Sequence, residues 1–159
     1  MHPVVLDGDL LDQKVEAIVN PWNRNLFPWW LLLPQGVSGA IKQRAGFAPF
    51  RELRRFGLLP LGDAVLTSAG QLPHRAIIHV AGIGLLWQAS PWSIQTSVRS
   101  AVRLASREGF RSLAIPLIGA GTGGVSVDES LRLTLEALGS VDFDGELRVV
   151  RYQKGRVHV

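Results

Sequence analysis

The segment from Leu113 to Ser126 reads LAIPLIGAGTGGVS and decides the fold, because an apolar run passes directly into a glycine-rich loop that ends at a helix cap. The apolar residues from Leu113 to Leu117 predict a buried strand. Ser126 and Glu129 have the S-x-x-E spacing of a capping box, so a helix is predicted to begin at Val127. A strand, a glycine loop and a helix in succession indicate an α/β fold.

The loop from Gly119 to Gly124 has the composition of a phosphate-binding segment. A helix N-terminus beside it offers unpaired N–H groups and a partial positive charge, and glycine backbone can approach a pyrophosphate closely. The loop also matches G-x-G-x-x-G, but it lies too late in the chain for a Rossmann unit, and no Lys-Ser or Lys-Thr follows it as in a Walker loop. The alternative is a turn that only joins a strand to a helix.

The composition favours one soluble domain over residues 1–159. The chain is 47% hydrophobic, enough for a core, and has no cysteine, which excludes disulfides and thiolate chemistry. Asp7 comes too early for a signal peptide, and no apolar stretch approaches about 18 residues. We therefore expect a cytoplasmic protein that does not bind membranes.

Charged and metal-ligating residues narrow the partner classes. The formal net charge of +4 favours anionic partners, and Arg99, Arg103 and Arg107 recur at helical spacing, which indicates either a solvated face or a surface for single-stranded nucleic acid. The four histidines are scattered, so the sequence predicts no metal site and no cofactor. His79 is expected to be a hydrogen-bonded interior residue of a strand.

Hydrophobic periodicity predicts strands that alternate with helices, the pattern of an α/β sandwich. Helices are expected from 36 to 46, from 91 to 109 and from 127 onward, the last with Leu131, Leu135 and Leu138 facing inward. Strands are expected at 4–6, 17–20, 62–67, 75–80, 113–117 and 146–152, with the third and fourth as neighbours.

Segments in a fixed order along the chain resemble the macrodomains, a family that binds ADP-ribose and processes ADP-ribose 1''-phosphate. They are Gly8–Leu10 with Val15–Asn23, Gln35–Ile41, Pro60–Ala64, Ile77–Gly82 and Ile115–Gly124. The resemblance covers nearly the whole chain. It implies a single macrodomain, a three-layer α/β/α sandwich with a mixed central sheet and a ligand crevice at the strand ends.

The resemblance also implies ligand-binding residues. Asp9 would accept a hydrogen bond from the adenine amino group, and Asn23 would approach the distal ribose. Two glycine loops would hold the diphosphate from either side. The implied ligand-binding residues are Asp9, Leu10, Asn20, Asn23, Gly36, Val37, Ser38, Ile118, Gly119, Ala120, Gly121, Thr122, Gly123, Gly124 and Val125.

Departures from the family pattern bear on catalysis. Ser38 stands where one hydrolytic class has an aspartate, and Gly123 stands where a second class has an acid. A serine hydroxyl is no base at neutral pH without activation. The first hypothesis is therefore a binder of ADP-ribose that is free, 1''-phosphorylated, O-acylated or protein-linked, which includes ADP-ribosylated protein as a partner.

Two alternatives remain open. The first is a hydrolase that removes ADP-ribose, phosphate or an acyl group from such derivatives, with Asn23 positioning the distal ribose. The second is a single-stranded nucleic-acid binder.

The segment from Pro21 to Pro34 is rich in aromatic residues. Family members often place an aromatic side chain in the second loop, where this chain has Thr122 and Gly123. The rings of Trp22, Phe27, Trp29 and Trp30 are expected either to line the ligand pocket or to pack in the core or a homodimer contact.

Overall fold

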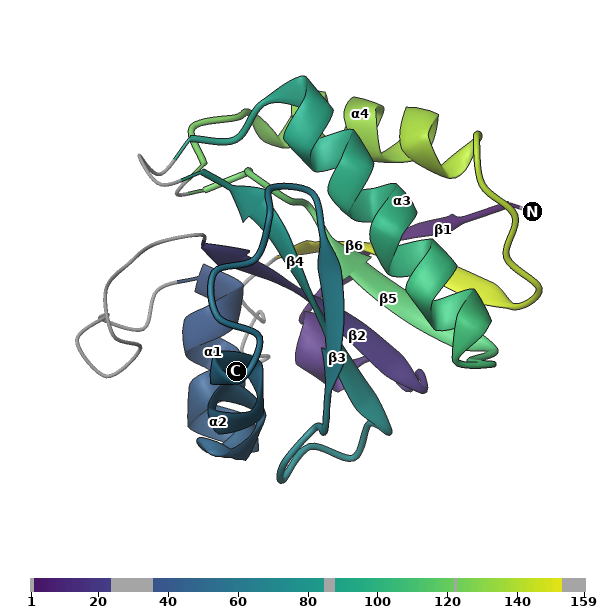
Figure 1. The fold of residues 1–159 in the computed structure, drawn as a ribbon. Coiled ribbons are helices and arrows are strands. Elements are labelled where there is room, and N and C mark those ends of the chain that lie inside the picture. Colours follow the sequence, from purple (N-terminus) through teal and green to yellow (C-terminus); the bar gives the residue numbers. More distant parts are fainter. Residues whose placement is uncertain (1, 24–35, 85–87, 122, 153–159) are drawn as a thin grey trace, which may run out of the picture.

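One mixed six-stranded sheet forms the centre of the protein in a computed structural model that describes residues 2–23, 36–84, 88–121 and 123–152 (Figure 1). The strand order is β1-β6-β5-β2-β4-β3, and every neighbouring pair is parallel except β4 with β3. The strands are β1 (Val4–Gly8), β2 (Ala17–Asn23), β3 (Ala64–Thr67), β4 (Ala76–Ile83), β5 (Ser112–Pro116) and β6 (Glu146–Tyr152).

Helices cover both faces of the sheet, which confirms the expected three-layer sandwich. Figure 1 shows α3 (Pro91–Arg107) and α4 (Val127–Leu138) on one face, with α1 (Gly36–Ala45) and α2 (Ala48–Arg54) on the other. A short 3-10 helix, Leu10–Asp12, packs on the α1/α2 side. A mixed sheet with crossover helices on both faces explains why the interior strands are apolar on both sides.

Two apolar clusters, one on each face, hold the layers together. Successive residues of a strand point to opposite faces, so Ile18 packs toward α1 and α2 while Val19 packs toward α3 and α4. Every residue of β4 is buried, including His79. The α3/α4 face also receives Ile118 and Ala89 from the loops next to the sheet.

The structure corrects the sequence predictions in two places and confirms the six strands and the three predicted helices. Helix α2 was not predicted. In α4 the inward face is formed by Leu133, Ala137 and Leu138 with the buried hydroxyl residues Ser130 and Thr134. Leu131 is partly buried and packs against this face, and Leu138 is buried, as predicted. Leu135 is 37% exposed, so the prediction that it faces inward is wrong. Two of the buried positions are Ser and Thr, which a search for leucines overlooks.

Across the described residues, the helices are too short or too polar to cross a membrane.

Candidate functional site

The fold brings the predicted ligand segments to one edge of the sheet. The parallel strands β1, β6, β5 and β2 end at the same edge. Asp9 follows β1, the loop Gly119–Val125 follows β5, and Gly36–Ser38 begins α1 after β2. Ligands of open α/β sheets bind outside the carboxyl ends of the strands. This edge is therefore the candidate site.

The glycine loop is a tight backbone turn that leaves N–H groups unused. Gly119, Gly121 and Gly124 have φ values of +81°, +145° and +75°, a region that favours glycine. Val125 N–H donates to the Gly119 carbonyl at 3.0 Å and closes the turn. Within the described residues, the N–H groups of Gly119, Gly121 and Gly123 donate to no protein acceptor. Unpaired donors beside a helix N-terminus suit an anion.

Close packing behind the loop fixes its shape and excludes a side chain at Gly123. A Cβ at Gly123 would lie 2.6 Å from the Gly119 Cα and 3.0 Å from the Ala89 Cβ. Ala89 N–H donates to the Gly123 carbonyl at 3.1 Å, and Ser130 Oγ donates to the Ile118 carbonyl at 2.7 Å. An acid at Gly123 would thus displace the loop. Nothing in the sequence marked Ala89, because its role comes from packing between distant segments.

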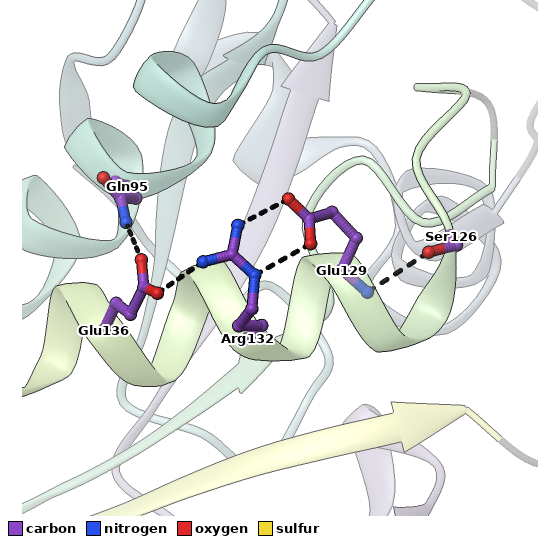
Figure 2. A network of polar contacts seen from close by, with 5 residues as sticks. All are labelled: Gln95, Ser126, Glu129, Arg132 and Glu136. Atoms are coloured by element: carbon purple, nitrogen blue, oxygen red, sulfur yellow. Dashed lines mark hydrogen bonds and ion pairs between the residues drawn. The ribbon is translucent and has the colours of Figure 1, made fainter.

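The cap of α4 differs from the predicted capping box in one half. Figure 2 shows Ser126 accepting from the Glu129 N–H, at 3.2 Å. The Glu129 carboxylate instead accepts hydrogen bonds from Nε and Nη2 of Arg132, at 2.9 and 2.7 Å. These bonds lower the pKa of Glu129. Arg132 also pairs with Glu136, which accepts from Gln95 of α3 at 2.9 Å. The expected reciprocal Glu129 bond is replaced by a network that links the two helices.

Asp9 has a local structural role as well as the predicted one. Its Oδ1 accepts from the Leu11 N–H at 2.8 Å and caps the 3-10 helix, while Oδ2 lies 3.8 Å from Arg44 Nη1. Arg44 also pairs with Asp12 at 2.9 Å. Leu10 is buried beneath this turn. The turn thus uses one Asp9 oxygen, and the adenine contact remains a prediction for the other.

Ser38 and Asn20 belong to a buried chain of polar side chains. Ser38 Oγ donates to Asn20 Oδ1 at 2.8 Å, and Asn20 Nδ2 lies 2.9 Å from His79 Nδ1. His79 Nε2 lies 2.8 Å from Thr67 Oγ1. We call these four residues the polar chain. Asn20 is fully buried, and its amide contacts Ser38 and His79, so a direct contact of Asn20 with a ligand stays a prediction.

The environment of His79 keeps its imidazole neutral. Complete burial lowers the pKa of His79 to about 3, and the Phe50 ring packs edge-on at 5.8 Å between centroids. The prediction of a hydrogen-bonded interior histidine is confirmed. Thr67 was missed, because the predicted pairing of strands 62–67 and 75–80 carried no register; in the structure Val65 is opposite His79, and Thr67 lies two residues further along β3.

Trp22 packs against the α1/α2 cluster. Its ring lies 5.6 Å from that of Phe50, and Lys42 Nζ lies 5.6 Å from Trp22 and 5.0 Å from Phe50. Burial lowers the pKa of Lys42. This supports the core alternative for Trp22.

Several predicted site residues lie outside the described part of the chain. Phe27, Trp29, Trp30 and Thr122 are outside it, and Asn23 is described only as the last residue of β2.

The arginines are distributed among local contacts. Arg99, on the predicted stripe with Arg103 and Arg107, donates to Ser140 at 2.9 Å. Other arginines pair with carboxylates, in the pairs Arg75–Glu16, Arg111–Asp144, Arg148–Glu146 and Arg151–Asp7. In the part of the chain that the structure describes, no three His, Asp or Glu side chains gather to hold a metal ion.

Comparisons with known proteins agree with this geometry. The model of the Macro domain family matches residues 19–134. An Aeropyrum pernix protein is 37% identical over 79% of this chain and 64% of its own length. An O-acetyl-ADP-ribose deacetylase of Klebsiella pneumoniae is 31% identical over 87% of this chain and 79% of the relative.

A solved structure shows the same fold with a ligand. The Trypanosoma brucei macrodomain in complex with ADP-ribose superposes with a TM-score of 0.80 at 26% identity, over 96% of this chain and 64% of that one. This chain thus spans just under two thirds of both the Aeropyrum and the Trypanosoma proteins.

Proposed function

The chain belongs to the Macro domain family, and from this premise we propose that it binds ADP-ribose at the edge formed by the carboxyl ends of β1, β5 and β2. The observation that carries the proposal is the glycine loop Gly119–Gly124, whose shape is set by packing and whose N–H groups at Gly119, Gly121 and Gly123 donate to no acceptor within the described residues. The Trypanosoma macrodomain was solved with ADP-ribose, which supports the same ligand class here.

The order of the strands suggests how the ligand lies. β1, which Asp9 follows directly, is separated from β2 by β6 and β5. Three strand spacings span about 14 Å, a length suited to an extended dinucleotide-like ligand. In the proposed arrangement the adenine lies at Asp9, the diphosphate over the glycine loop of β5, and the distal ribose at Asn23 and Ser38.

We also propose that residues 1–159 act as one macrodomain. The strands β1 and β6 lie outside the matched residues 19–134, yet β6 pairs with β5 and β1 pairs with β6. They therefore complete the sheet that carries the site.

Calorimetry with ADP-ribose, AMP and NAD tests the binding function. We expect ADP-ribose to bind, and Asp9→Asn to weaken binding by about tenfold or more. The amide keeps an oxygen that can accept from the Leu11 N–H, but its NH2 group is a donor and would face the donor amino group of adenine. Asp12→Asn is the matched control, since Asp12 also pairs with Arg44 but is 65% exposed in its side chain. No heat with ADP-ribose at near-millimolar concentration would contradict the function, and equal effects of the two variants would contradict the adenine assignment.

A second candidate function is hydrolysis of an ADP-ribose derivative, because a relative is named O-acetyl-ADP-ribose deacetylase. The described site holds Ser38 against an amide oxygen, which is not a base that could activate it. We therefore expect no turnover of O-acetyl-ADP-ribose or ADP-ribose 1''-phosphate. Turnover that is abolished by Asn23→Ala would favour the hydrolase instead.

The salt dependence of binding distinguishes the nucleic-acid alternative from the binding of ADP-ribose. A nucleic-acid binder would bind poly-A with a steep salt dependence and show no response to ADP-ribose. The arginine pairs described above give little support to a continuous basic surface.

A further inference from the structure

The polar chain from Thr67 to Ser38 has one direction of hydrogen bonding that satisfies its atoms. Thr67 Oγ1 donates to the Ser68 carbonyl at 2.9 Å. A hydroxyl has one proton, so Thr67 accepts from His79 Nε2. The ring proton of His79 therefore lies on Nε2, and Nδ1 carries the lone pair.

The same direction continues to the ligand edge. Because His79 Nδ1 is an acceptor, it receives the Asn20 amide N–H, and the Asn20 oxygen faces Ser38. The Ser38 hydroxyl gives its proton to that oxygen. Ser38 Oγ can then only accept a hydrogen bond from a ligand. The Ser38 residue is half-buried, so a ligand can reach it.

The neutral imidazole makes this direction stable. A protonated ring would set a second N–H against the Asn20 amide N–H, and full burial in an apolar cluster opposes the charge. A fully satisfied buried network of this kind fixes the orientation of its members. The orientation that it fixes here ends at the ligand edge, at the Ser38 hydroxyl.

We propose that Thr67, His79 and Asn20 are positioning residues that hold the Ser38 hydroxyl as a hydrogen-bond acceptor, so that the site selects an ADP-ribose with a free hydroxyl on its terminal ribose. This inference rests on the proposed function, because a ligand with its adenine at Asp9 presents its other end to β2 and α1. A phosphate or acyl oxygen in that place would face Ser38 Oγ with no proton between the two acceptors, so such a ligand would bind more weakly.

Removal of the Thr67 hydroxyl should reverse the chain. In Thr67→Val the Nε2 proton has no acceptor, so the proton moves to Nδ1 and the Asn20 amide rotates to accept it. The Asn20 N–H then faces Ser38, whose proton is released toward the ligand. Ser38 thereby changes from an acceptor into a donor.

Nitrogen NMR of labelled protein reads this direction without any ligand. The shifts of the two ring nitrogens show which one is protonated, and loss of the signals in His79→Gln assigns them. We expect the Nε2–H form in the wild type and in Thr67→Ser, and the Nδ1–H form in Thr67→Val. Thr134→Val is the matched control, because Thr134 is fully buried and its Oγ1 has no partner among the described residues.

Calorimetry then tests the effect on ligand choice. We expect the wild type to prefer ADP-ribose over ADP-ribose 1''-phosphate, and Thr67→Val to lower this affinity ratio by about threefold or more, the worth of one hydrogen bond. Thr67→Ser and Thr134→Val should keep the wild-type ratio.

The possible results distinguish failure of this inference from failure of the proposed binding of ADP-ribose. An Nδ1–H ring in the wild type, which needs no variant to measure, would overturn the direction. A reversed ring with an unchanged affinity ratio would overturn the ligand selection. If the wild type binds neither nucleotide, the proposed function fails together with the selection, while the direction of the chain is still decided by the nitrogen shifts.

Discussion

The two faces of the central sheet support the same ligand edge in different ways. On the α3/α4 face, the glycine loop is shaped by apolar packing of Ile118 and Ala89 and offers backbone N–H groups. On the α1/α2 face, the polar chain passes through a cluster that is otherwise apolar and offers one oriented hydroxyl at Ser38.

The difference indicates that the two faces recognise different properties of a ligand. Backbone N–H groups recognise an anion of any origin, and they depend on the absence of side chains at positions such as Gly123. The polar chain depends instead on the identity of each hydrogen-bonding atom and distinguishes donors from acceptors. Changes to the loop should therefore alter affinity for every diphosphate ligand, and changes to the polar chain should alter the choice among ligands.

The largest expected effect comes from breaking the loop. Gly119→Ala adds a Cβ 2.7 Å from that of Ala89, and displacement of one N–H from a phosphate should weaken ADP-ribose binding by about 10- to 150-fold. Gly109→Ala is the control, since its φ of +76° is close to the +81° of Gly119 and its Cβ meets open space. Calorimetry should show full affinity for the control, and similar losses in both variants would argue against the anion site.

The next effect is a pH dependence from the polar chain. The pKa of His79 is about 3 in the folded protein, against an ordinary value of 6.5 in the unfolded chain, so above pH 6.5 the ring is neutral in both states and contributes nothing. Below pH 6.5 the unfolded state binds more protons, and stability falls until about pH 3. At pH 5 the loss should be about 2 kcal/mol in the free energy of unfolding.

Urea unfolding at pH 7 and pH 5 measures this loss. His79→Gln is the comparison, because it removes the titration and leaves the other ionisable groups in place. An equal pH dependence in both proteins would contradict the buried neutral histidine.

A smaller effect separates the buried threonines of the two faces. Thr67→Val should lower the free energy of unfolding by about 1–2 kcal/mol, because it removes the Thr67 hydrogen bonds to the Ser68 carbonyl and to His79 Nε2, while reversal of the polar chain keeps the other two. Thr134→Val should leave stability unchanged or raise it, since its hydroxyl has no partner among the described residues. Thermal unfolding of both variants checks this, and a greater loss for Thr134→Val would count against the assignment.

The smallest effect concerns the cap behind the glycine loop. Ser126→Ala should cost about 0.5–1 kcal/mol as the loss of an N-cap. Glu129→Gln should cost less than about 0.5 kcal/mol, because its carboxylate binds the exposed Arg132 and not the helix terminus. Urea unfolding of the two variants at high salt should leave only the Ser126 effect. A larger loss for Glu129→Gln would restore the reciprocal capping box.

The sequence predicted most of the fold because its signals were local. Apolar runs marked the strands, and Ser90-Pro91 marked the start of α3, where Ser90 and Ser93 form a reciprocal cap in the structure. Helix α2 was missed because it is only seven residues long and follows Gly46 and Phe47 without a capping side chain.

The candidate site was only partly predictable. The glycine segments were recognisable by composition, but Ala89 and Thr67 act through contacts between distant segments. Gly123 must be glycine because a Cβ there would lie 2.6 Å from the Gly119 Cα, and the spacing of the sequence does not reveal this contact. Asn20 was predicted as a ligand residue from the family resemblance, whereas the fold buries it as a link between Ser38 and His79.

A crystal structure of the protein soaked with ADP-ribose tests the central claim most directly. We expect diphosphate oxygens within hydrogen-bonding distance of the N–H groups of the glycine loop, the adenine amino group at Asp9 and a ribose hydroxyl at Ser38 Oγ. A diphosphate bound away from Gly119–Gly124, or an adenine at Ser38, would contradict it.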